Sequence, residues 1–428
     1  MHIPYLVKIL VSLAVILVMY RAVKKLSLSM AIGTVALVFW CGHTAKSALN
    51  IALSCVFSYD TFFLTLVVFQ VIWLSIQMAE TGSMKNLVGA VKALTGRSAS
   101  FALLPALIGL LPMPGGALFS APLVQDCDSE ELLRPELKTC INYWFRHIWE
   151  YWWPLYPGVL LAVQITGLPM LTFSAMQILL SVCSVTGGYL FILRKIPRVP
   201  AGITFHTERK KNILIFARAM LPVFITVVFF FLIRIIIPGS LQINTYVPMI
   251  GGIFFAQVFL QIISPLSIKK WLQMIFSKES LSLALLVVII RLYGAYIDSP
   301  LPHGTLLIDM VRNELLSWGI PFVFLYALLP YICGLTTGIC VGFVGASFPL
   351  IMNLLGNNPP VNQIMAVTAL GYGFGYIGMI LSPVHVCLVV TNKYFCTSPF
   401  TAMRHLVKPS LCVLAGATGL YVFFMYGV

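Results

Sequence analysis

Long apolar segments recur along the chain and are separated by short polar segments. Their apolar residues are continuous rather than alternating, which predicts helices instead of the strands of a β-barrel. Most are close to the about 20 residues that a helix needs to cross a bilayer. Ten such segments lie at about 4–20, 27–43, 61–79, 142–164, 170–193, 212–237, 245–266, 280–298, 361–391 and 409–427.

Residues 44–58 leave the membrane topology open. They form either a short extra span or a segment that enters and leaves the membrane on one side. A full crossing here would reverse the orientation of every later segment.

Two further apolar segments are interrupted in the middle, at about 98–127 and 319–355. In the first, the cluster Pro112–Gly116 divides the segment into halves too short to cross a bilayer. Both segments contain the pattern L-P-x-x-x-G-L, at Pro105 and Pro330. Paired interrupted segments predict two re-entrant hairpins, which in secondary transporters carry the binding site.

The order of the segments is the same in both halves of the chain. Each half has three spans, an amphipathic stretch, a hairpin, a span interrupted by Pro or Gly, and a last span. Five crossings per half is an odd number, so we expect an inverted repeat, with the first hairpin entering from the cytoplasm and the second from outside. The expected repeats are 1–193 and 212–428, joined by a basic cytoplasmic linker at 194–211.

Composition agrees with an all-α polytopic membrane protein. Of the 428 residues, 60% are hydrophobic and only 9% are charged, more apolar surface than a soluble domain can bury. The formal net charge is +14, and most of the 27 Lys and Arg residues lie in loops on one side of the predicted topology. This bias is typical of cytoplasmic loops, so we expect a multi-pass protein of the cytoplasmic (inner) membrane, in contact with lipid and not with nucleic acid.

The hairpin tips are candidate binding sites. Glycines allow a ligand to approach the backbone, and free N–H groups at the start of a half-helix suit an anion. The alternative is that these small residues serve only close helix packing. The candidates are Pro114, Gly115, Gly116, Ala117 and Ser120 in the first hairpin, and Thr336, Thr337 and Gly338 in the second.

The two spans that follow the hairpins are themselves interrupted. The first contains Pro154 and Pro157, and the second contains several glycines and then Ser382 followed by Pro383. Proline removes a helical hydrogen bond and bends the chain. We expect these two breaks and the two hairpin tips to meet near the middle of the bilayer, with Ser382 lining the site.

Ionisable residues inside the membrane are costly and mark functional sites. Glu150 is the one acidic residue in the interior of a predicted span, and Arg146, four residues earlier, would lie on the same helix face. With His147 and His385, these residues predict an anion contact, a proton relay or a gate. The alternatives are a structural ion pair with Arg146 extended to the interface, and a neutral, hydrogen-bonded His385.

Enzyme and metal signatures are absent from the sequence. There is no H-E-x-x-H, no phosphate-binding loop and no dinucleotide-binding glycine pattern. His147-x-x-Glu150 resembles a fragment of a metal site, but no third ligand has a helpful spacing, and the ten cysteines are expected to be apolar packing residues. We therefore expect no enzymatic activity, no metal and no cofactor, other than H⁺ or Na⁺ as a coupling ion.

Three strings resemble a family of prokaryotic integral membrane proteins: PMPGGALFSAP, INYWFRHIWEYWWPLYPG and LSPVHVCLVVTNKYF. That family is placed in the ion-transporter clan with gluconate, citrate, arsenite and dicarboxylate–sodium transporters. The resemblance implies a homodimeric elevator transporter with a scaffold part and a moving part. The dicarboxylate relatives carry Ser-Asn-Thr motifs at their hairpin tips, whereas this chain has Pro-Met-Pro-Gly-Gly and Thr-Thr-Gly. This difference weakens the expectation that their dicarboxylate specificity and sodium coupling apply to this chain.

The sequence thus predicts a secondary active transporter of a small, organic anion, driven by a proton or sodium gradient. One alternative is a cation/proton antiporter that depends on Glu150. Another is a lipid-handling membrane enzyme or flippase that uses Arg146 and His147 at the interface, and a last one is a receptor or assembly subunit without transport.

Overall fold

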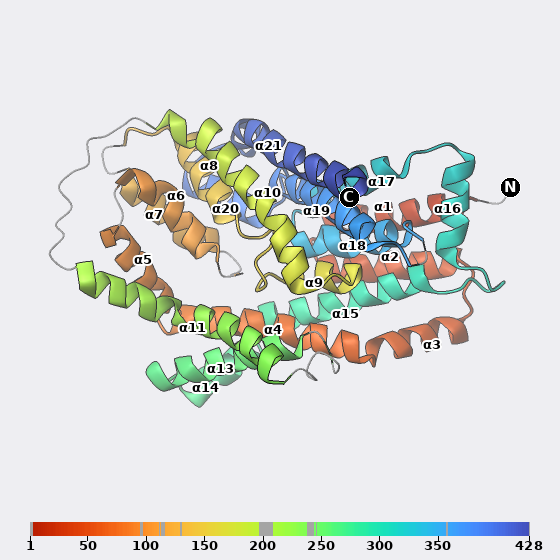
Figure 1. The fold of residues 1–428 in the computed structure, drawn as a ribbon, viewed down its shortest axis with the longest axis horizontal. Helices are drawn as coiled ribbons and strands as arrows, with labels where there is room; N and C mark the ends of the chain where they lie inside the picture. Colours follow the sequence, from red (N-terminus) through yellow and green to blue (C-terminus); the bar gives the residue numbers. More distant parts are fainter. Residues whose placement is uncertain are drawn as a thin grey trace.

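The computed structural model contains helices and connecting loops (Figure 1), and among the described residues a single isolated β-bridge joins Pro300 and Leu306. The described residues are 3–94, 97–110, 112, 116–128, 131–196, 209–237, 244, 246–356 and 358–427. The all-α prediction is confirmed for this part of the chain.

The first half of the chain forms helices close to the predicted segments. These are α1 (Tyr5–Val23), α2 (Leu26–Trp40), α3 (Ala45–Val56), α4 (Tyr59–Glu80), α5 (Ser83–Leu94), α6 (Arg97–Ile108), α7 (Gly116–Cys127), α8 (Pro135–Arg146), α9 (Pro157–Thr166) and α10 (Met170–Phe191), followed by the short 3₁₀ helix η1 (Leu193–Lys195).

The second half repeats this order. It contains α11 (Arg209–Ile236), α13 (Val247–Ile263), α14 (Ile268–Ile275), α15 (Lys278–Asp298), α16 (Leu307–Ser317), α17 (Phe322–Thr337), α18 (Cys340–Asn353), α19 (Val361–Ile380), α20 (Val386–Tyr394) and α21 (Pro399–Tyr426).

Seven helices within the described residues are long and apolar enough to cross a membrane, and an eighth span results if the bent pair α16–α17 is counted as one. Many large apolar side chains on these helices are exposed, for example Phe224, Val228 and Ile235 on α11, which suits contact with lipid. The chain is therefore a multi-pass membrane protein. Helices α2 and α13, with 15 and 17 residues, are shorter than the spans predicted for them.

Residues 44–58 contain α3, a helix of 12 residues that is too short to cross a bilayer. Thr44 caps its first turn by accepting a hydrogen bond from the Ser47 N–H.

Both interrupted segments fold as pairs of short helices that contact each other, α6 with α7 and α17 with α18. Helix α17 also makes an angle of 117° with α16, which precedes it. The angle arises at Gly319, whose φ of +65° lies in the left-handed region that glycine tolerates.

Helix contacts follow the same pattern in the two halves. Helix α1 packs on α2 as α11 packs on α13, and α5 contacts α11 as α16 contacts α1. Across the halves, α7 contacts α20 as α18 contacts α9, and the equivalent helices α4 with α15 and α10 with α21 pack on each other. Exchanging the two halves therefore leaves this set of contacts unchanged.

The most buried helices are those that carry breaks. Helix α18 is buried along most of its length, and α19 is buried from Ala366 to its end apart from Phe374. Helix α17 can approach α19 closely because Gly378 has no side chain. A Cβ there would lie 2.1 Å from the Tyr331 carbonyl oxygen. Helices α8, α18 and α19 therefore lie mostly in the interior, whereas α17 and α20 also expose large apolar side chains.

Candidate functional site

Two helix breaks define the site. Helix α8 ends at Arg146, and the chain runs through turns until α9 begins at Pro157. Helix α19 ends at Ile380, and α20 begins at Val386 after Ser382 and Pro383. The prediction that Arg146 and Glu150 share a helix face is wrong, because the helix ends before Glu150 is reached.

Buried tyrosines bind carbonyl groups that the breaks release from helical hydrogen bonding. The Tyr376 hydroxyl donates to the His147 carbonyl at 2.6 Å, and Tyr372 donates to the Glu150 carbonyl at 2.8 Å. In the opposite direction, Tyr143 on α8 donates to the Ile380 carbonyl at 3.0 Å. Each interrupted helix thus satisfies backbone groups of the other, as a water-poor interior requires.

Each break is also tied to the hairpin of its own half. The N-cap residue of α9 is Tyr156, whose hydroxyl donates to the carbonyl of Gly109 at the end of α6. The N-cap residue of α20 is His385, whose Nδ1 lies 2.6 Å from the carbonyl oxygen of Gly338 at the end of α17. The two contacts occupy equivalent places in the two halves.

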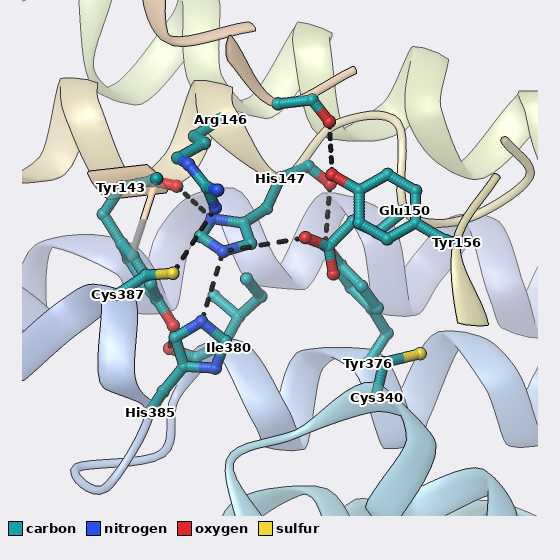
Figure 2. Close-up of polar contacts among 12 residues, drawn as sticks. Tyr143, Arg146, His147, Glu150, Tyr156, Cys340, Tyr376, Ile380, His385 and Cys387 are labelled. Carbon is teal, nitrogen blue, oxygen red and sulfur yellow. Dashed lines mark hydrogen bonds and ion pairs between the residues drawn. The ribbon is translucent and has the colours of Figure 1, made fainter. Parts of the chain in front are cut away.

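Two histidines from different halves meet at the centre of the site (Figure 2). The Nε2 atoms of His147 and His385 are 3.2 Å apart, and Nδ1 of His147 lies 2.5 Å from the Tyr143 carbonyl oxygen. Oε1 of Glu150 lies 3.8 Å from Nε2 of His147. All three ionisable side chains are buried.

Arg146 lies beside this pair and against the first hairpin. Its side chain is buried, with the residue only 3% exposed, and its guanidinium donates to Sγ of Cys387 at 3.4 Å. A Cβ at Gly116, the first residue of α7, would lie 2.1 Å from Nη2 of Arg146. The start of α7 therefore touches the guanidinium directly.

The second hairpin tip packs on the second break. Gly338 has φ of +62°, and a Cβ there would lie 2.9 Å from the backbone nitrogen of His385. Ser382 donates its hydroxyl to the Leu335 carbonyl at 2.6 Å. The structure therefore brings Gly338, Ser382 and His385 together.

The remaining candidate residues are placed differently. Ser120, Thr336 and Thr337 donate their hydroxyls to carbonyls one turn earlier in their own helices. Those hydroxyl hydrogens are already used, so an anion at the tips would be held by backbone N–H groups and Arg146. Ala117 is buried in the first turn of α7, and Pro114 and Gly115 lie outside the described residues.

Sequence reasoning missed Cys387 and the four tyrosines at positions 143, 156, 372 and 376. Cys387 was grouped with the apolar packing cysteines, yet it lies with His147 and His385 in a group whose ligand atoms are all within 4.8 Å of one another. The signal was the pattern His385-x-Cys387 directly after a Ser-Pro break.

A separate cavity of about 780 Å³ opens between α3, α9, α15 and α18. Its lining includes Arg291, Asp298 and Asn353, together with Gln164 and Thr166 from the end of α9. The other end of α9 is Pro157, beside the buried cluster. This helix therefore connects the cavity with the site.

Comparison with curated proteins finds no match. A family model does match residues 6–428, and its description reads "Protein of unknown function (DUF401)". Because the match spans nearly the whole chain, the protein belongs to the DUF401 family.

Proposed function

We propose that this protein is a secondary active transporter of a small organic anion in the cytoplasmic membrane, driven by a proton or sodium gradient. The observation that carries the proposal is the meeting of two helix breaks and two hairpins around buried Arg146, His147, Glu150 and His385.

An inverted repeat underlies the proposal. The helices occur in the same order twice, and the helix contacts described above for the fold are preserved when the halves are exchanged. Three spans, one interrupted span and a last span per half give ten crossings in all, with α6–α7 and α17–α18 as re-entrant hairpins. Such repeats place substrate and ion sites at the interface between the halves.

The membrane environment explains why this interior points to transport. Irregular backbone at membrane depth is tolerated only where protein buries it or where it lines a cavity. A buried arginine, a carboxylate and two histidines are expensive there. Proteins that need only a stable bundle fill such positions with apolar residues, so the cluster indicates a solute or ion pathway.

Arg146 favours an anion as the solute. Its guanidinium has five N–H donors in a fixed plane, and it touches the first residue of α7. The start of a helix carries partial positive charge and backbone N–H donors. The two together suit a carboxylate or a similar planar anion.

Alternating access follows from the expected elevator architecture. In it, the hairpins and interrupted helices move together as a body against a scaffold, in a homodimer like that of the ion-transporter clan. The cavity that Arg291 lines would give solutes a route from one side.

Binding is tested by thermal shift of the purified protein against a panel of small anions, with and without sodium, at two pH values. A ligand that binds only the folded state stabilises it by about 2.7 kcal/mol at 100 times its Kd. We expect at least one carboxylate to raise the melting temperature. Transport of that anion into proteoliposomes would then establish the activity.

Variants locate the binding. In Gly116→Val the new side chain displaces the Arg146 guanidinium, and the anion shift should disappear; Arg146→Lys keeps the charge, loses the planar donors and should reduce the shift. Gly419→Val is the matched control, because a Cβ at Gly419 meets nothing within 4 Å. Stabilisation by cations alone would overturn the proposal and favour a cation/proton antiporter.

A further inference from the structure

The orientation of the two central histidines is determined by their outer ring nitrogens. Nδ1 of His147 is 2.5 Å from the Tyr143 carbonyl oxygen, and Nδ1 of His385 is 2.6 Å from the Gly338 carbonyl oxygen. A carbonyl oxygen only accepts hydrogen bonds, so both Nδ1 atoms carry the hydrogen. In the neutral rings, both Nε2 atoms then present lone pairs, and these lone pairs face each other across 3.2 Å.

Two facing lone pairs in a buried site repel unless a cation lies between them. The separation of 3.2 Å is close to that of two nitrogens bound to one tetrahedral Zn²⁺, which is about 3.3 Å for bonds of 2.0–2.1 Å. The 3.2 Å separation thus suits a pair of metal ligands without rearrangement of the helices.

Other ligands lie in the same small volume (Figure 2). Sγ of Cys387 lies within 4.8 Å of both imidazole ligand atoms. Oε1 of Glu150 is 3.8 Å from Nε2 of His147, close enough to act as a fourth ligand after a small side-chain adjustment. Two imidazoles, a thiolate and a carboxylate are a ligand set for a borderline-soft divalent cation.

The contacts around the two histidines resemble those that orient the ligands of known metal sites. Metal-binding histidines usually donate their other N–H to a carbonyl or carboxylate, and both histidines do so here. The ring of Tyr143 packs edge-on against both imidazoles, with centroids 4.8 and 5.3 Å apart. Arg146 donates to the Cys387 sulfur and offsets the charge of a thiolate.

We propose that His147, His385 and Cys387, with Glu150 as fourth ligand, bind a divalent transition-metal cation of the Zn²⁺ class. Local spacing shows only fragments of this ligand set, because its members come from opposite halves of the chain, with the two histidines 238 positions apart. The metal site goes beyond the proposed transport function, and it is tested by binding and not by transport.

Co²⁺ is the probe, because a thiolate bound to it adds a charge-transfer band to the absorption spectrum. The full chain is purified in detergent without a polyhistidine tag, treated with a chelator and titrated with Co²⁺, then with Zn²⁺ in competition. We expect about one Co²⁺ per chain, a thiolate charge-transfer band, and displacement of Co²⁺ by Zn²⁺.

Cys387→Ser should abolish the charge-transfer band, and His385→Gln should lower the affinity at least tenfold. Cys396→Ser, which changes an exposed free cysteine, is the matched control and should leave the titration unchanged. Size-exclusion profiles establish that each variant is folded. If His385→Gln does not fold, the conservative Cys387→Ser still decides the test.

Two results would overturn the proposal. One is a charge-transfer band that persists in Cys387→Ser. The other is metal binding by the wild type no stronger than that of the His385→Gln variant, in which case a proton and not a metal separates the two imidazoles. Neither result bears on the anion shifts that test the transport proposal.

Discussion

Some side chains of the site have two roles. They position the buried cluster, and they also form hydrogen bonds with backbone carbonyls at the helix breaks. Tyr376 is an example: it is buried on α19, and its hydroxyl holds the carbonyl of His147 at 2.6 Å. That carbonyl belongs to the residue whose imidazole faces His385. The position of the imidazole therefore depends on a tyrosine from the other half of the chain.

We expect Tyr376→Phe to destabilise the protein by about 0.5–1.5 kcal/mol, because the His147 carbonyl loses the tyrosine hydrogen bond and keeps only the one from the Glu150 N–H. The melting temperature of the purified protein should fall. The matched control is Tyr59→Phe, which changes a side chain that is 79% exposed and should leave the melting temperature unchanged. Equal melting temperatures for both variants would show that the hydroxyl contributes nothing to closing the break.

The charged residues of the cluster were predictable from the sequence, and their partners were not. Arg146, His147, Glu150 and His385 stand out because charge is rare inside apolar segments. The tyrosines resemble ordinary aromatic residues of membrane helices, and their acceptors lie far away in sequence, 229 positions in the case of Tyr376 and His147. Spacing along one helix carries no information about contacts between halves.

At the scale of helices, proline and glycine made most of the breaks predictable. The hairpins appear where Pro112–Gly116 and Gly338 interrupt apolar segments. The end of α8 at Arg146 was missed, because it comes eight residues before Pro154 and no glycine or proline marks it. Its cause is tertiary, since the carbonyls after Arg146 are bound by α19.

Helices α10 and α21 provide a direct test of how the halves pack. A Cβ at Gly416 would lie 3.4 Å from Cβ of Cys183, close to the about 3.5–4.5 Å of a disulfide. In a Cys412→Ser background, Gly416→Cys should therefore crosslink to Cys183 on mild oxidation. A protease site inserted between residues 197 and 208 allows the two halves to be separated on a gel.

After cleavage, we expect the halves of the Gly416→Cys variant to stay together without reductant and to separate with it. Gly419→Cys is the control, because nothing lies within 4 Å of a Cβ there, and its halves should always separate. Halves of Gly416→Cys that separate under oxidising conditions would mean that α10 and α21 do not pack as described.

For the whole molecule, the order of helices was largely predictable, because the lengths of the apolar segments and the positions of their interruptions can be read directly from the sequence. The orientation of each half is a different matter. It depends on the positive charge of the loops and on whether residues 44–58 cross the membrane. Helix α3, with 12 residues, is too short to cross the membrane, which supports a topology in which the two halves have opposite orientations in the membrane.

In the proposed architecture, the two hairpins enter the membrane from opposite faces and meet at the buried cluster. Cysteines introduced one at a time in a Cys396→Ser background report the side of the membrane from which each hairpin enters. Leu132→Cys lies after α7, and Asn358→Cys lies after α18. Lys25→Cys marks the cytoplasmic side. A membrane-impermeant maleimide applied to intact cells should label Asn358→Cys, and applied to inverted vesicles it should label Leu132→Cys and Lys25→Cys. Labelling of Leu132→Cys and Asn358→Cys from one and the same face would contradict the inverted repeat, and with it the proposed site.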